Sequence, residues 1–246
     1  MVDPNIMDDA LLITRLKTIR ELHPTFLLDA SYGVLNAAGN PCLDSELVAS
    51  WVAKVGGVTF TQPLEAEQPR WLECGIGNRP ALLFDGSDDF LVSRQTAALR
   101  AALSSQSGTI VAVTQMTVAN GAVLSCVISG YDGGVTARAI GFGYGSTAKT
   151  YTRASVDGPV VSSGTGSTVV GTNKAVATWT TNEAATEWEH YVDAVKQTMT
   201  GGGVGNDGKW LDDITNWTRC AVGSYSEGLY PFPGRIALIA GWNTRL

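Results

Sequence analysis

The chain has 246 residues, of which 44% are hydrophobic and only 16% charged, and its formal net charge is −6. This length can form one large β domain, and the acidic balance excludes the basic surface expected of a nucleic-acid-binding or membrane-surface protein. Glycine is frequent, at 28 residues, which favours tight turns over long helices. No apolar run approaches the ~20 residues of a membrane-spanning helix, and the N-terminus lacks a secretory-signal pattern. We therefore expect synthesis in a reducing cytoplasm and free, mostly buried cysteines.

A helix is predicted over residues 3–22. An aspartate and a proline open it, acidic residues follow early and basic residues come late, as the helix dipole favours. Leu12, Leu16 and Ile19 share one stripe at i, i+4 and i+7 spacing. Two interpretations stay open: the helix packs on its own domain, or the stripe is an oligomerisation or docking arm.

The rest of the chain is predicted to be β structure. Short apolar or alternating segments separated by Pro and Gly turns predict strands over residues 26–29, 50–52, 71–72, 81–84, 108–116, 122–129, 137–144, 150–154, 174–180, 187–195, 220–224 and 235–241. We expect 174–180 and 187–195 to be paired central strands. Residues 95–103 predict a surface helical turn, and the glycine-rich stretches 162–167 and 201–208 predict loops. Strands without alternating helices favour a β-sandwich or jelly roll.

Residues 78–93, NRPALLFDGSDDFLVS, are the most informative stretch. Two apolar runs flank a Gly- and Asp-rich turn, which predicts a β-hairpin. Asp85, Asp88 and Asp89 cluster in this turn and could supply oxygen ligands to Ca²⁺. Turn chemistry alone also explains them, because Asp and Gly are what a tight turn requires, and we favour that explanation. No other cofactor is expected.

Several short segments together carry a family resemblance. They are FLLDAS (26–31), VASW (48–51), QPRW (68–71), the segment 78–91, WEHYVD (188–193), VGS (222–224) and PGRIA (233–237). In this order and spacing, the chain from Phe26 onward resembles the LamG-like jelly rolls of the concanavalin A-like lectin and glucanase superfamily. Ala194 and Leu238 depart from the family, which usually has Gly and Glu there. The resemblance implies an all-β, concanavalin A-like β-sandwich over residues 25–246, preceded by an N-terminal α-helical arm over residues 1–24.

That fold hosts lectins, glycosidases and adhesive modules, so it does not by itself give a function. A single sandwich with an added arm and no signal sequence is similar to virion proteins of tailed bacteriophages. We therefore expect a non-enzymatic structural or adhesive protein of a virion surface, either a capsid decoration or a tail-associated protein. Its expected partners are other virion proteins or a second copy of itself, and it would be made in the host cytoplasm.

Two alternatives remain. A carbohydrate-binding lectin module would use exposed aromatic residues near loops, for which the candidates are Trp210, Trp217, Tyr225, Tyr230 and Phe232. These could equally belong to the core, as we expect for Trp51, Trp71, Trp179 and Trp188. A glycosidase would need paired carboxylates in one cleft. Glu187 and Glu189 have strand spacing, but Tyr191 stands where a third acid is expected, so that set is incomplete.

Overall fold

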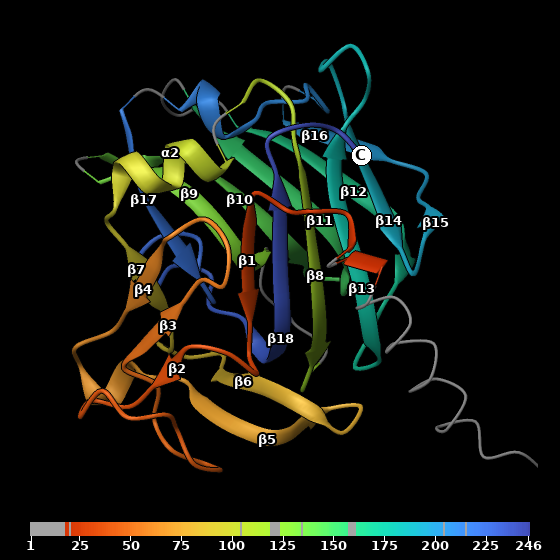
Figure 1. The fold of residues 1–246 in the computed structure, drawn as a ribbon. Coiled ribbons are helices and arrows are strands. Elements are labelled where there is room, and N and C mark those ends of the chain that lie inside the picture. Colours follow the sequence, from red (N-terminus) through yellow and green to blue (C-terminus); the bar gives the residue numbers. More distant parts are fainter. Residues whose placement is uncertain are drawn as a thin grey trace, which may run out of the picture.

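The computed structural model describes residues 18–19, 21–103, 105–118, 124–133, 135–156, 161–203, 205–214 and 216–246. Two antiparallel sheets pack face to face and form an all-β sandwich, which confirms this part of the predicted fold (Figure 1). At the N-terminal end, Thr18, Ile19 and Glu21 are helical. Leu12 and Leu16 lie outside the described residues. No helix in the described ranges is long and apolar enough to cross a membrane.

Within the described residues, one sheet has eight strands. Their order is β15-β14-β13-β8-β18-β6-β5, with β1 also paired to β18. The bounds are β1 (Phe26–Asp29), β5 (Arg70–Ile76), β6 (Arg79–Asp85), β8 (Thr109–Met116), β13 (Lys174–Thr181), β14 (Trp188–Val192), β15 (Val195–Lys196) and β18 (Pro233–Trp242).

The other sheet has ten strands in the part of the chain described. Their order is β16-β12-β11-β10-β9-β17-β7-β4-β3-β2. The bounds are β2 (Val34–Leu35), β3 (Ser50–Val52), β4 (Thr59–Thr61), β7 (Leu91–Ser93), β9 (Leu124–Asp132), β10 (Val135–Gly145), β11 (Lys149–Ser155), β12 (Ser162–Val169), β16 (Thr200–Gly203) and β17 (Trp217–Val222). Helix α2 (Thr96–Leu103) and the 3-10 turns η1 (Glu65–Glu67) and η2 (Leu211–Asp213) lie between strands.

The main core fills the space between the sheets. Alternation along each strand sends every second side chain inward. Trp51, Trp179 and Trp188 are fully buried, as expected, and Trp71 is partly buried against the same core. Apolar side chains also cover part of both outer faces, and these outer clusters form the surfaces considered below.

The predicted hairpin at residues 78–93 is wrong. β6 pairs with β5 and β18 in the eight-stranded sheet, whereas β7 pairs with β4 and β17 in the ten-stranded sheet. The turn therefore carries the chain across the edge of the sandwich, from one sheet to the other. Phe84 and Leu91 both end in the shared core, so the crossing buries the same residues that a hairpin would.

Residues 162–167 form most of strand β12 rather than the expected loop. This strand pairs with β11 and β16, and its small residues have a packing reason. A Cβ atom on Gly164 would come within 2.9 Å of Met199 and 3.1 Å of the Trp188 ring. Part of the second predicted loop is also a strand, because β16 covers its first residues.

The pairing of residues 174–180 with 187–195 is confirmed, since β13 and β14 form an antiparallel ladder. Their predicted central position is wrong. β14 is followed only by the two-residue β15 at that side of the sheet, and the middle of the sheet is formed by β8 and β18. The closing C-terminal strand is thus more central than the sequence suggested.

Candidate functional site

Three of the five candidate aromatic residues belong to the core, which corrects their interpretation as ligand-facing. Trp210, Trp217 and Phe232 have side chains at most 1% exposed. The Trp210 ring lies 4.9 Å from the Phe142 ring, centroid to centroid. Trp217 Nε1–H donates to the carbonyl oxygen of Arg219 at 2.7 Å. Aromatic rings in these positions fill the sandwich and cannot stack on a sugar.

The other two candidates, Tyr225 and Tyr230, lie on the outer face of the ten-stranded sheet. They belong to the segment between β17 and β18, which folds back on that face. A Cβ on Gly141 would come within 2.6 Å of the Tyr225 ring, so the glycine makes room for it. The Tyr225 hydroxyl donates to the Ala139 carbonyl at 2.8 Å, and burial raises the pKa of Tyr225 above its ordinary value.

Tyr230 is half-buried and lies with its ring centroid 5.7 Å from that of Tyr225. Its backbone is in the left-handed region, with φ of 51°, which is uncommon for a bulky residue. Its carbonyl accepts the Cys126 N–H at 3.1 Å, which ties the strained segment to β9. Strain of this kind costs on the order of 1–3 kcal/mol and is concentrated at functional sites.

Arg153 completes this group from β11. Its guanidinium carbon lies 5.9 Å from the Tyr225 ring centroid and 5.6 Å from that of Tyr230. Its buried Nε has no hydrogen-bond partner in the described part of the chain, and none of the ion pairs among those residues involves Arg153. Half-buried Tyr151 lies two residues earlier on the same face of β11 and packs against the same cluster. We call Tyr151, Arg153, Tyr225 and Tyr230 the Arg153 platform.

The chemistry of the Arg153 platform is that of a cation on aromatic rings. Such a guanidinium keeps donors available for oxygen acceptors. The half-buried rings of Tyr151 and Tyr230 can present apolar faces beside it, whereas Tyr225 is only 4% exposed and supports the guanidinium. Sequence reasoning missed Arg153. The available signal was alternation along β11, where Thr150 and Thr152 face inward and therefore Tyr151 and Arg153 face outward.

Other arginines on this side of the molecule are already neutralised. Glu227 accepts from Arg94 at 3.0 Å, from the Tyr131 hydroxyl at 3.2 Å and from Arg219. Burial alone would raise the pKa of Glu227, but the charge and hydrogen bond of Arg219 and the Tyr131 hydroxyl hold that pKa below its ordinary value. Arg153 therefore differs from Arg94 and Arg219 in having charge to offer a ligand.

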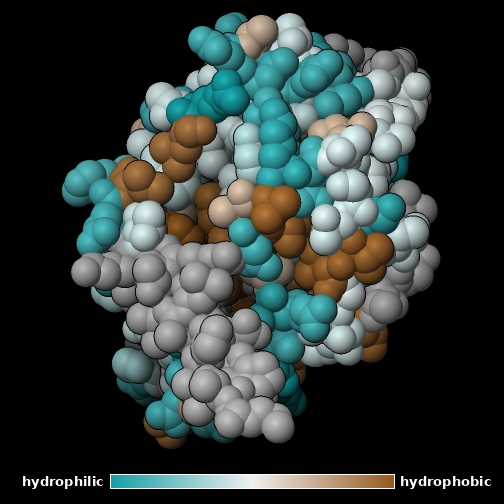
Figure 2. All heavy atoms as spheres, turned by 90° about the vertical axis from the view of Figure 1, so that its right-hand side faces the viewer, coloured by the Kyte–Doolittle hydropathy of each residue, from teal (hydrophilic) through white to brown (hydrophobic). Residues whose placement is uncertain are grey.

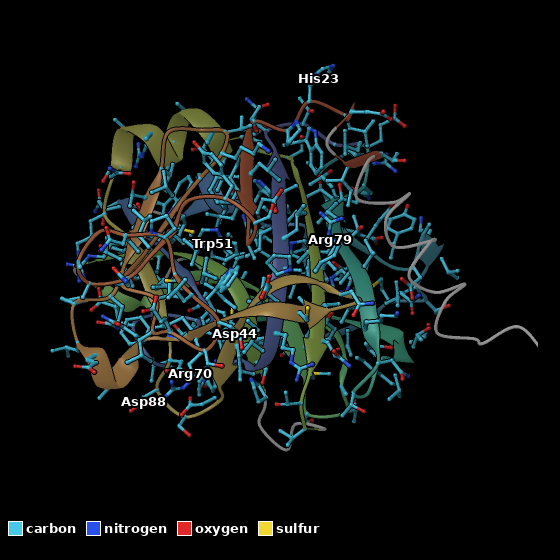
Figure 3. All side chains as sticks on the ribbon, turned by 60° about the horizontal axis from the view of Figure 1, so that its bottom comes forward. His23, Asp44, Trp51, Arg70, Arg79 and Asp88 are labelled. Atoms are coloured by element: carbon cyan, nitrogen blue, oxygen red, sulfur yellow. The ribbon has the colours of Figure 1, made fainter. Side chains whose placement is uncertain are left out.

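A polar groove lies at another edge of the sandwich, beside the crossing turn. Two adjoining cavities of about 550 and 570 Å³ share Leu47, Glu65, Gln68 and Arg70. Figure 3 shows Arg70 on this edge of the molecule, with Asp88 nearby. The lining is polar or aliphatic and contains no aromatic residue, so a sugar ring would find no stacking partner there.

The three aspartates of the crossing turn lie together, with carboxylate oxygens within 4.8 Å of one another. Two of the three carboxylates already accept hydrogen bonds from backbone N–H groups within the turn. Asp85 Oδ1 accepts the N–H groups of Ser87 and Asp88, and Asp89 Oδ2 accepts the Asp85 N–H at 2.8 Å. Burial raises the pKa of Asp89 to about 7, helped by the neighbouring carboxylates. These bonds account for the turn without a metal ion.

The carboxylates considered for a glycosidase do not form a pair in one cleft. Glu187 is exposed and precedes β14, whereas Glu189 lies on the outer face of the eight-stranded sheet. Burial would raise the pKa of Glu189, but hydrogen bonds from Lys196 and Tyr191 and the charge of Arg245 lower it below its ordinary value. A general acid needs the opposite shift.

The chain matches no protein-family model and no curated protein. Among solved structures, a Trypanosoma rangeli sialidase is similar over 90% of this chain and 30% of its own, with 15% identity and a TM-score of 0.56. NanB sialidase from Streptococcus pneumoniae is similar over 68% of this chain and 26% of its own, with 12% identity and a TM-score of 0.50. A Ruminococcus gnavus IT-sialidase CBM40 bound to alpha2,3 sialyllactose covers 57% of this chain and 77% of its own, with 18% identity and a TM-score of 0.48.

This chain thus spans less than a third of the two sialidases that share its fold at a TM-score of 0.50 or more. At these identities the similarity concerns the fold alone. It is consistent with a concanavalin A-like jelly roll, and it does not extend to the LamG-like or bacteriophage part of the resemblance.

Proposed function

We propose that this chain is a non-enzymatic carbohydrate-binding protein and that glycans bind at the Arg153 platform. The observation that carries the proposal is the position of Arg153, which lies over two tyrosine rings with its buried Nε unpartnered. Sugars present one apolar C–H face and a rim of hydroxyl or carboxylate oxygens. The half-buried rings of Tyr151 and Tyr230 match the first, and the Arg153 guanidinium matches the second.

The platform is also held in place, as a binding site requires. Tyr225 is fixed by its hydrogen bond to Ala139 and by the glycine beneath it. Tyr230 is held in a strained conformation by the Cys126 N–H. Because these side chains need little rearrangement on binding, little conformational entropy would be lost.

The virion location remains part of the proposal. Ile19 packs on the outer face of the eight-stranded sheet, which supports an N-terminal arm attached at a fixed point on the sandwich. A fixed arm on one side and a glycan site on the other would suit an adhesive protein of a virion surface, joined to other virion proteins or to a second copy. A mass-spectrometric search for this chain in purified virions tests that location, and consistent absence would contradict it.

The glycan proposal is tested with a glycan array and calorimetry on the full chain. The panel should contain neutral and acidic oligosaccharides. R153Q is expected to weaken the best binder at least tenfold, because a charge-assisted hydrogen bond is lost, and Y230A at least about fivefold.

The matched control is R70Q, which removes a charge of the same kind from the polar groove and should leave binding unchanged. If R70Q weakens binding and R153Q does not, the groove is the site and the platform is not. If the folded wild-type chain binds no glycan on either array or calorimeter, the proposal is wrong.

A further inference from the structure

An apolar groove of about 420 Å³ lies on the outer face of the eight-stranded sheet, opposite to the core. It crosses β8, β13 and β14 and ends at the turn after β14. Its lining includes Val111, Val176, Thr178, Tyr191, Ala194 and Leu246. Figure 2 shows apolar side chains gathered on this side of the molecule among polar ones. A contiguous apolar surface of this kind is typical of a site that binds a ligand, a partner or another segment of the chain.

One wall of the groove is formed by the end of the N-terminal arm. Thr18, Ile19 and Leu22 line it. Ile19 is only 6% exposed and packs with Leu27, Val111 and other outer-face residues. Trp242 Nε1–H donates to the Leu22 carbonyl at 2.9 Å, which fixes Leu22 against β18.

We infer that the occupant of this groove is the chain's own segment 1–17. The segment joins the described structure at Thr18, which is itself a groove residue. Leu12 and Leu16 precede Ile19 on one helical stripe, so a helix that seats Ile19 on the sheet turns both leucines toward the same face.

The dimensions agree with this assignment. Leu12 lies seven residues before Ile19, which is ~10 Å along a helix at 1.5 Å per residue. β8 and β14 are two strand spacings apart, or about 10 Å. The stripe therefore has the length of the groove that it would cover.

Because segment 1–17 is tethered beside the groove, it has an advantage over any separate molecule that could bind there. A segment attached at the edge of its site has an effective concentration on the order of millimolar. A second copy, or any other protein with an apolar helix, would have to compete with that concentration. We therefore expect the groove to be occupied by the arm of the same molecule in preference to a second molecule.

The test uses the full chain and two double variants that add the same charge. L12E/L16E places two carboxylates on the stripe, and A10E/T14E places two on the opposite side of the same helix. L12E/L16E is expected to lower the melting temperature by roughly 5–10 °C, because two buried leucines are lost from the groove. A10E/T14E should leave it unchanged, with both variants keeping the β-sheet circular dichroism spectrum.

A cross-link identifies the occupant independently of stability. L16C/T178C is made in a C74S background, because Cys74 is the exposed free cysteine. Oxidation should give a cross-linked monomer on a non-reducing gel, with light scattering showing one chain. A disulfide-linked dimer would show that the groove takes the arm of a second copy instead. No cross-link, or equal melting temperatures for the two double variants, would show that the arm does not occupy the groove.

Discussion

His190 should make the stability of the fold depend on pH below neutrality. Its ring, from β14, is fully buried and joins the two sheets. Nε2 lies 2.8 Å from the Thr152 hydroxyl and Nδ1 lies 3.2 Å from the Thr150 hydroxyl, both on β11. Burial lowers the pKa of His190 from 6.5 to about 3, because a charged ring would have to leave water.

The size of the effect follows from the two pKa values. At pH values between 6.5 and about 3, His190 is protonated in the unfolded chain but not in the folded one. The free energy of unfolding therefore falls as the pH drops below 6.5, and this loss of stability is complete near pH 3. The full loss is about 5 kcal/mol, and about 2 kcal/mol of it occurs between pH ~8 and pH ~5. Asp89 acts in the opposite direction, because its raised pKa adds stability as the pH falls through about 7.

A difference measurement isolates the histidine from Asp89. Urea unfolding of the wild type and of H190Q is compared at pH ~8 and pH ~5. The amide of glutamine keeps one donor and one acceptor for the two threonines, but it does not titrate. The wild-type advantage over H190Q should shrink by about 2 kcal/mol at the lower pH. H23Q, which changes the exposed histidine, is the control. A wild-type advantage that is the same at both pH values would refute the reasoning.

Two further predictions concern residues singled out from the sequence. W210A should cost about 3–5 kcal/mol of unfolding free energy in a urea titration, because the ring is part of the core; a fully stable variant that loses only glycan binding would contradict this. We expect the turn containing Asp85, Asp88 and Asp89 to function without calcium, so the melting temperature should be the same in millimolar CaCl₂ and in EDTA. A rise of several degrees in calcium that D88N abolishes would instead establish a metal site.

The strands were predictable where a short run of apolar or branched residues is bounded by turns. β1, β3 and β8 begin and end within a residue of their predicted bounds, because burial alternates along β3 and branched side chains dominate β8. β12 was missed for the opposite reason. Its Ser, Gly and Thr residues resemble a loop, and only the positions of Trp188 and Met199 show why residue 164 must be glycine.

The crossing turn shows a limit of local patterns. The same pattern, an Asp- and Gly-rich turn between two apolar runs, occurs in hairpins and in turns that carry the chain from one sheet to the other. Phe84 and Leu91 are buried in both cases, so their hydrophobicity does not distinguish them. Pairing with β5 and β18 on one side, and with β4 and β17 on the other, is decided by strands distant in the chain.

The candidate site was only half predictable for a similar reason. Tyr225 and Tyr230 were chosen as aromatic residues near loops, but so were Trp210, Trp217 and Phe232, which lie in the core between the sheets and not on an outer face. Composition cannot separate these groups, because a large β-sandwich needs aromatic side chains in its core as well. Arg153 joins the two tyrosines only through the register of β11 with β10 and the return of a segment more than 70 positions later.

The position of β18 has a consequence for synthesis. This last strand lies between β8 and β6 and also pairs with β1, and the Thr25 hydroxyl donates to the carbonyl of Gly241, 216 positions away. Until β18 has been made, β1 lacks its partner strand, and β6 and β8 can pair only with β5 and β13, which leaves one edge of each open. Such edges attract other chains, and contacts between distant residues form slowly. A chaperone that holds the nascent chain until residue 242 has emerged should therefore raise the yield of folded protein, and a nonsense mutation just before β18 should yield aggregate rather than a shorter sandwich.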